Sequence, residues 1–202
     1  MEKRTCTPLV ASILLVIIGF AAGCFGTTPA SRFYVLSPMM APEKNMPVDE
    51  LVGVFPVRLP DYLDQPQIVT RVSPNELRKS EFDRWAEPLK ENFTRVLVEN
   101  LLVLLGPDKV LSMPRTIDIP ITRSVFVEVF QFDGNSAGEV VLFARWSLFQ
   151  SSFKTLLQTK TSTFKESAGG PGYEPFVAAC SRALASLSSE IALAIKSSAK
   201  SS

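Results

Sequence analysis

Residues 124–150, SVFVEVFQFDGNSAGEVVLFARWSLFQ, hold two runs of alternating apolar side chains on either side of a turn-forming segment. A period of two places every second side chain on the same face of a strand, and Asp133-Gly134-Asn135 is typical of a chain reversal. The stretch therefore predicts a long antiparallel pair, with strands over 117–132 and 139–150. A third strand over 153–165 follows a short serine connection and extends the pair to a meander.

Two helices and several short strands surround this meander. Residues 87–105 carry apolar side chains at helical spacing between Pro88 and Gly106-Pro107, and residues 173–196 form a second, alanine-rich helical stretch. Shorter strands are predicted upstream, at 32–36, 51–57, 68–72 and 76–80. This order of elements predicts an α+β fold, an antiparallel sheet with two main helices packed on one face.

The long strands carry apolar side chains on both faces. One face holds the stripe of Val125, Val127 and Val129, and an antiparallel sheet with one solvated face should present polar side chains on the other. Aromatic side chains occupy that second face instead, which predicts cover by the chain's own N-terminal segment, by another subunit or by a partner. The candidate oligomer-interface residues are Phe126, Phe130, Phe143 and Phe149, and Phe132 is predicted on the same face.

The N-terminus is typical of a targeting segment rather than of part of the fold. Lys3 and Arg4 precede an apolar run from Leu9 to Phe20 that is too short to cross a bilayer comfortably, and small residues then lead into Cys24. A cysteine directly after Ala-Ala-Gly resembles the lipobox of bacterial lipoproteins. The resemblance implies that residues 1–23 are a cleaved lipoprotein signal peptide and that Cys24 is acylated. An uncleaved signal anchor, or a plain signal peptide with an incidental cysteine, is the alternative.

The mature chain has the length of one domain. Residues 24–47 are assigned to the lipidated cysteine, a short tether and the first strand, residues 48–196 to the main domain, and residues 197–202 to a frayed tail. The tether, residues 25–31, reaches at most roughly 25 Å when fully extended. The folded domain is therefore expected to lie close to the membrane surface.

Composition argues against nucleic-acid binding and against common catalytic chemistry. Removing residues 1–23 takes two basic and one acidic side chain from totals of 21 and 20, so the mature chain is neutral and does not attract nucleic acid. The chain has no histidine, which excludes Ser-His-Asp hydrolysis and the common zinc sites, and it has no phosphate-binding glycine loop. Cys180 is left without a disulfide partner and is predicted to be a buried apolar residue. We predict no catalytic residue, no metal and no cofactor.

Two sequence blocks resemble the PqiC (paraquat-inducible protein C) family of ABC-type transport auxiliary lipoproteins. The first block, residues 56–71, is PVRLPDYLDQPQIVTR, and the second, residues 82–89, is FDRWAEPL. The resemblance implies a non-enzymatic outer-membrane lipoprotein that faces the periplasm and contributes to envelope integrity. Phe25, rather than Asp, follows the acylated cysteine, so the inner-membrane retention signal of enteric bacteria is absent.

The same resemblance implies the partners. The protein would work with a periplasm-spanning protein of mammalian-cell-entry (MCE) domains and, indirectly, with an inner-membrane transport partner. Together they would move lipid between the two membranes. The resemblance also implies a homo-oligomer, expected as a ring, held on outer-membrane lipid through its acyl anchor. A lipid-anchored periplasmic hydrolase and a pilot or assembly lipoprotein for another outer-membrane complex are the alternative functions.

The two blocks also supply the candidate site. Two prolines bracket a loop, residues 61–65, that we expect to be pinned against the first helix by ion pairs from Arg71 or Arg84. Direct contact with a partner is the alternative, and Trp85 suits an anchor role at an interface. The acidic residues considered for these ion pairs are Asp61, Asp64 and Glu87. The full candidate set is Arg58, Asp61, Tyr62, Asp64, Arg71, Arg84, Trp85 and Glu87.

Overall fold

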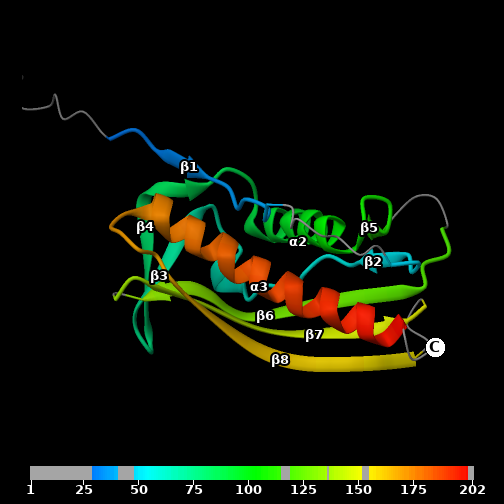
Figure 1. Cartoon of the computed structure of the whole chain (residues 1–202). Helices are drawn as coiled ribbons and strands as arrows, with labels where there is room; N and C mark the ends of the chain where they lie inside the picture. The colour runs from blue at the N-terminus through cyan, green and yellow to red at the C-terminus, as the bar shows by residue number, and fades with distance from the viewer. Residues whose placement is uncertain (1–28, 41–47, 115–118, 136, 152–154, 200–202) are drawn as a thin grey trace, which may run out of the picture. The chain divides into compact units, whose positions relative to one another are not determined.

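A mixed eight-stranded sheet and two long helices make up the described part of the chain (Figure 1). The computed structural model describes residues 29–40, 48–114, 119–135, 137–151 and 155–199. The predicted signal peptide and Cys24 lie outside these residues. The predicted α+β fold is confirmed, with one difference: the sheet is mostly antiparallel but contains parallel pairs.

The predicted meander is formed by β6 (Arg123–Asn135), β7 (Glu139–Gln150) and β8 (Thr155–Ser167). The β6–β7 register runs from Arg123 opposite Gln150 to Gly134 opposite Val140. The strand β6 therefore continues through Asp133 and Gly134, which the sequence analysis assigned to the turn. The reversal comes later, around Gly138, whose φ of 75° is a conformation that glycine adopts readily.

Parallel pairs on the other side of β6 make the sheet mixed. β2 (Val52–Val54) lies along the start of β6 and also pairs in parallel with β5 (Val110–Ser112). β3 (Gln67–Ser73) lies along the end of β6. β4 (Glu76–Trp85) returns antiparallel to β3, and β1 (Arg32–Tyr34) pairs in parallel with its last three residues.

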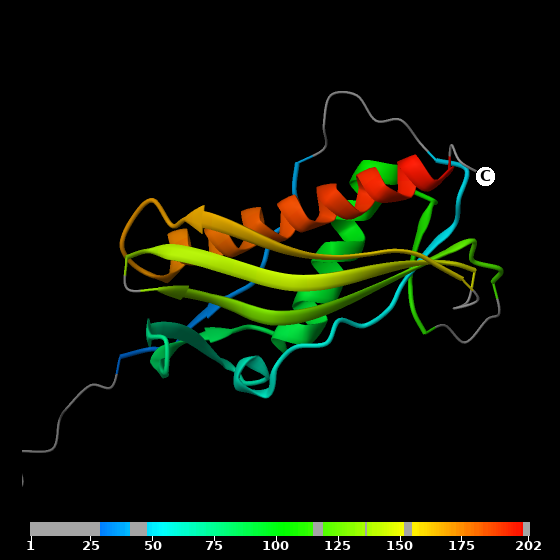
Figure 2. The same cartoon turned by 90° about the horizontal axis from the view of Figure 1, so that it is seen from below.

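Both helices, α2 (Leu89–Leu105) and α3 (Tyr173–Ala199), lie on the same face of the sheet. In Figure 2 the strands β6, β7 and β8 are in front, and both helices are behind them. Residues 197–199 belong to α3 although the sequence analysis assigned them to the frayed tail. In length and composition α3 resembles a membrane-spanning helix, but 61% of its apolar window is buried inside the fold. Its apolar face is thus used as a core helix.

The core fills the space between the sheet and the helices. Trp146 of β7 is fully buried beneath α3, and its Nε1 donates a hydrogen bond to Glu190 at 2.6 Å. Cys180 is buried as predicted, and burial raises the pKa of its thiol, which disfavours the reactive thiolate.

Phe132 corrects one detail of the predicted strand faces. It was expected on the outer, aromatic face, but it is only 3% exposed and packs edge-on against Phe93 of α2, with ring centroids 5.3 Å apart. A register irregularity between Val129 and Gln131 is the reason, because a β-bulge shifts the following side chains to the opposite face.

Candidate oligomer and partner interface

One buried carboxylate, Asp133, holds the loop of residues 61–65 against the end of the sheet. The loop contains the single-turn helix η2 (Asp61–Leu63), and the Tyr62 hydroxyl donates to Asp133 Oδ2 at 2.8 Å. Arg71 donates to both Asp133 oxygens, at 3.2 and 2.9 Å. Burial and the neighbouring carboxylate raise the pKa of Tyr62 to about 12. The hydroxyl therefore remains a proton donor at any physiological pH.

Among the described residues, the polar contacts that hold the loop therefore run to the sheet and not to the helix. Arg71 pairs with Asp133 of β6 instead of with an acidic side chain of the loop or the helix start. Among the described residues, Asp61 and Asp64 have no ion pair. Glu87, just before α2, pairs with Arg95 of α2 at 2.6 Å, so its carboxylate is bound to the helix and not to the loop.

Arg84 and Trp85 lie where the two sequence blocks meet. The Trp85 side chain is 6% exposed, and its backbone N–H donates to the Pro66 carbonyl at 2.7 Å. The Nε of Arg84 is buried and has no hydrogen-bond partner among the described residues. Beside them lies a hollow of about 300 Å³, lined by Asp64, Gln65, Pro66, Trp85, Ala86, Glu87 and Pro88. A small, mostly apolar hollow with two carboxylates in its lining suits contact with a partner side chain.

A second buried carboxylate, Asp83, joins β1 to β4. Its Oδ1 accepts from the Tyr34 hydroxyl at 3.0 Å and lies 2.8 Å from Arg32 Nη2, and its Oδ2 accepts from the Ser80 hydroxyl at 2.9 Å. Burial acts to raise the pKa of Asp83, but these hydrogen bonds outweigh it and lower the pKa below the usual range. The charged form is therefore the one that holds the strand.

Acidification should weaken the contacts of Asp83 that join β1 to β4, here called the Asp83 clamp. Because the folded-state pKa of Asp83 lies below its unfolded value, its contribution to stability is present above about pH 4 and is lost as the pH falls through the folded pKa. Urea unfolding at a series of pH values tests this. We expect Asp83→Asn to have a lower free energy of unfolding than wild type near neutral pH and a smaller loss on acidification. Parallel pH profiles for the two proteins would contradict the assignment.

Neither Asp83 nor Asp133 is among the candidates chosen from the sequence. Neither lies in a predicted strand: the strand before Asp83 was predicted to end at residue 80, and the strand before Asp133 at residue 132. Asp133 was assigned to a turn, where an aspartate needs no further explanation.

The outer face of the meander carries the aromatic side chains that the sequence places there. Phe126 stacks on Phe55 with ring centroids 4.4 Å apart and meets Phe149 edge-on at 5.7 Å. Phe130 packs against Phe143 at 5.1 Å, and Phe143 is 37% exposed. Large aromatic side chains of this kind are enriched at protein–protein contacts.

Charged side chains cross the same face. Glu128 lies between Arg58 and Arg145, with N–O distances of 3.9 and 4.0 Å, and the Arg145 guanidinium lies 5.3 Å from the Phe130 ring centroid. Arg58, chosen from the first sequence block, therefore belongs to this face and not to the Asp133 cluster. An open hollow of about 460 Å³ is lined by Phe55, Pro56, Arg58, Phe126, Val127, Glu128, Arg145, Ser147 and Phe149. Aromatic rings beside exposed arginines suit binding to a protein surface.

Asp83 and Asp133 are the buried carboxylates of the described residues. In that part of the chain, no three His, Cys, Asp or Glu side chains gather as a metal site would require. The two buried carboxylates are both engaged by hydrogen bonds that hold strands and loops in place.

Comparison with known proteins agrees with the fold. The model of the family described as "ABC-type transport auxiliary lipoprotein component" matches residues 34–192. A crystal structure of an uncharacterized protein is 26% identical, with a TM-score of 0.70 over 83% of this chain and 99% of that one. The Xanthomonas campestris protein XCC0632, of the DUF330 family model, is 18% identical, with a TM-score of 0.69 over 84% of this chain and 99% of that one. No curated protein matches.

Proposed function

Because the chain belongs to the family of ABC-type transport auxiliary lipoprotein components, we propose that it is a non-enzymatic subunit of an MCE-protein lipid transport system. In this role it sits at the outer membrane, faces the periplasm and receives the end of a periplasm-spanning MCE-domain protein. An inner-membrane transport partner acts on it only through that protein. Lipid passes between the two membranes, and the envelope keeps its integrity.

The family match over residues 34–192 is the observation that carries this proposal. Two further features support it. The segment before Cys24 resembles a lipobox, so the domain would be held on a membrane by its acyl chains. The absence of histidine from the whole chain removes the commonest general base, which favours a binding role over hydrolysis.

Purification from membranes tests the proposal. A tagged, lipidated protein is extracted in mild detergent, and the proteins that remain bound are identified by mass spectrometry. We expect an MCE-domain protein in the wild-type sample and its loss from Cys24→Ser, which is no longer held at the outer membrane. Recovery of an unrelated outer-membrane complex would favour the pilot or assembly role instead. Loss of function through a single polar side chain, without loss of folding or partner binding, would favour a hydrolase.

We also expect the domain to associate with copies of itself. Burying a large apolar side chain contributes about 1.5–3 kcal/mol, and the outer face offers several aromatic rings. Light scattering on an acyl-free protein that begins near Thr27 should give a mass several times that of one chain. Phe143→Ser should lower that mass, whereas Thr155→Ser on β8 should not. A strictly monomeric mass at high micromolar concentration would contradict self-association.

A further inference from the structure

Two long strands at opposite ends of the sheet have an unpaired edge. Starting from β8, neighbouring strands follow the path β8–β7–β6–β3–β4, and among the described strands β8 pairs only with β7. At the other end, β1 covers only Asp83–Trp85 of β4, so residues 76–82 have no neighbour on that side among the described strands. Unpaired edges expose a row of backbone donors and acceptors that can bind another strand.

The directions of these two strands favour pairing between copies. β7 is antiparallel to both β6 and β8, so β8 runs in the same direction as β6. β3 is parallel to β6, and β4 is antiparallel to β3. β4 therefore runs opposite to β8. If copies repeat side by side in the same orientation, β8 of one copy meets β4 of the next in an antiparallel pair.

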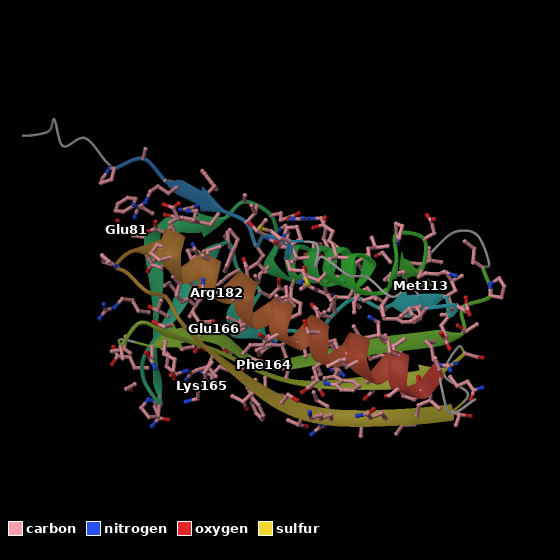
Figure 3. All side chains as sticks on the ribbon, in the orientation of Figure 1. Glu81, Met113, Phe164, Lys165, Glu166 and Arg182 are labelled. Atoms are coloured by element: carbon pink, nitrogen blue, oxygen red, sulfur yellow. The ribbon has the colours of Figure 1, made fainter. Side chains whose placement is uncertain are left out.

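The charges on the two strands are complementary in one register. When Lys165 is opposite Glu76, the antiparallel count places Phe164 opposite Leu77 and brings Lys160 near Glu81, which lies within the register shift of β4 between Lys79 and Arg84. Lys165 and Glu81 are labelled on their strands in Figure 3. Opposite charges that face each other across an antiparallel pair are stabilising, whereas like charges are destabilising.

Each of these side chains is available for a second contact. Lys160 and Lys165 bind Glu190 and Glu139 within the chain, yet remain 49% and 63% exposed. Each ammonium group has three N–H donors, so one intrachain carboxylate leaves room for another acceptor. In the described part of the chain, Glu76 and Glu81 are exposed and form no ion pair.

We propose that β8 of one copy and residues 76–82 of β4 in the next copy form a head-to-tail antiparallel pair that builds the homo-oligomer. This inference rests on the self-association in the proposed function and adds a second contact between copies to the one expected at the outer aromatic face. A contact between two different edges repeats from copy to copy and closes into a ring if the rotation allows. Rotation about one axis also keeps every lipid anchor at the same height, so all copies can insert into one membrane.

Pairing of β8 with a second β8 is less favourable. β8 has two lysines and one glutamate, so in an antiparallel pair of β8 strands at least one lysine of each copy has no glutamate opposite it. For those lysines β4 supplies Glu76 and Glu81, which form no ion pair with any described residue. The edge contact is also separate from the aromatic outer face, so the two surfaces can be changed independently.

Cysteine cross-linking of the full-length protein in membranes tests the register. In the proposed pair Thr163 is opposite Arg78, and facing residues of an antiparallel pair have Cα atoms about 4.5–5.5 Å apart, within the range of a disulfide. Oxidation of the Thr163→Cys/Arg78→Cys variant should give a ladder of dimers, trimers and larger species. Each single variant should leave the monomer, and so should the matched Thr155→Cys/Arg78→Cys variant.

Charge reversal provides the second measurement. We expect Lys165→Glu or Glu76→Lys alone to weaken the subunit dissociation constant of the mature protein in detergent about tenfold, and the double reversal to restore it. Lys90→Glu on α2 serves as the matched control and should change nothing.

Three outcomes would overturn the edge contact. The first is an oligomer of wild-type mass without a ladder, which leaves the proposed self-association intact. The second is a dimer from Thr163→Cys alone, which indicates β8–β8 pairing. The third is a monomeric wild-type mass, which contradicts both this contact and self-association.

Discussion

Replacing Asp133 by alanine should lower the free energy of unfolding by about 3 kcal/mol, because the change removes one partner of a buried ion pair. The Asp133 side chain is 1% exposed, and it accepts hydrogen bonds from Arg71, Tyr62 and Gln131. Without the carboxylate, Arg71 is left as a partly buried charge with no counterion, and the loop of residues 61–65 loses its attachment to β6. Urea or thermal unfolding followed by circular dichroism measures the effect.

Glu128→Ala is the matched control for this variant. It also removes a carboxylate from β6, but the Glu128 side chain is 39% exposed and its arginine partners are 3.9 and 4.0 Å away. Ion pairs of that kind contribute at most about 1 kcal/mol. Equal destabilisation by the two substitutions would mean that Asp133 does not hold the loop as described.

Cys24→Ser should abolish lipid attachment and remove the protein from the outer-membrane fraction. Each buried methylene of an acyl chain contributes about 0.8 kcal/mol to membrane binding, so loss of the chains removes most of the affinity of a neutral domain for the membrane. Metabolic labelling with palmitate and fractionation of membranes measure the two effects. Cys6→Ser and Cys180→Ser are the controls, and both should be labelled like wild type. Equal labelling of Cys24→Ser would contradict the assignment of the lipidated residue.

The elements with strong periodicity could be predicted from the sequence, and the contacts between distant segments could not. Alternating residues defined β7, and helical spacing with Pro88 and Gly106 defined α2. The parallel pairing of β2 and β3 with β6 has no local signal, because it joins segments that are far apart in the chain. It depends on how the whole sheet assembles.

In the candidate site, too, local features could be predicted from the sequence and a contact between distant segments could not. The two sequence blocks do meet, beside Trp85 and Pro66, but the buried acceptor that fixes the loop comes from a third segment. Arg71 was chosen from the sequence, but its partner was missed because Asp133 resembled a turn residue. Phe132 was assigned to the wrong face because a β-bulge has no clear signature in a run of apolar residues.

The Asp83 clamp, which joins β1 to β4, has a mechanical consequence for a protein held by its N-terminus. β1 is parallel to β4, and Arg32 and Tyr34 both bind the buried Asp83. A load applied along the β1 axis acts on its backbone hydrogen bonds and on these side-chain contacts at the same time, so they share the force. Tension from a membrane anchor would therefore pass from β1 through β4 and β3 into β6, the central strand of the sheet. The two helices would carry that tension only indirectly.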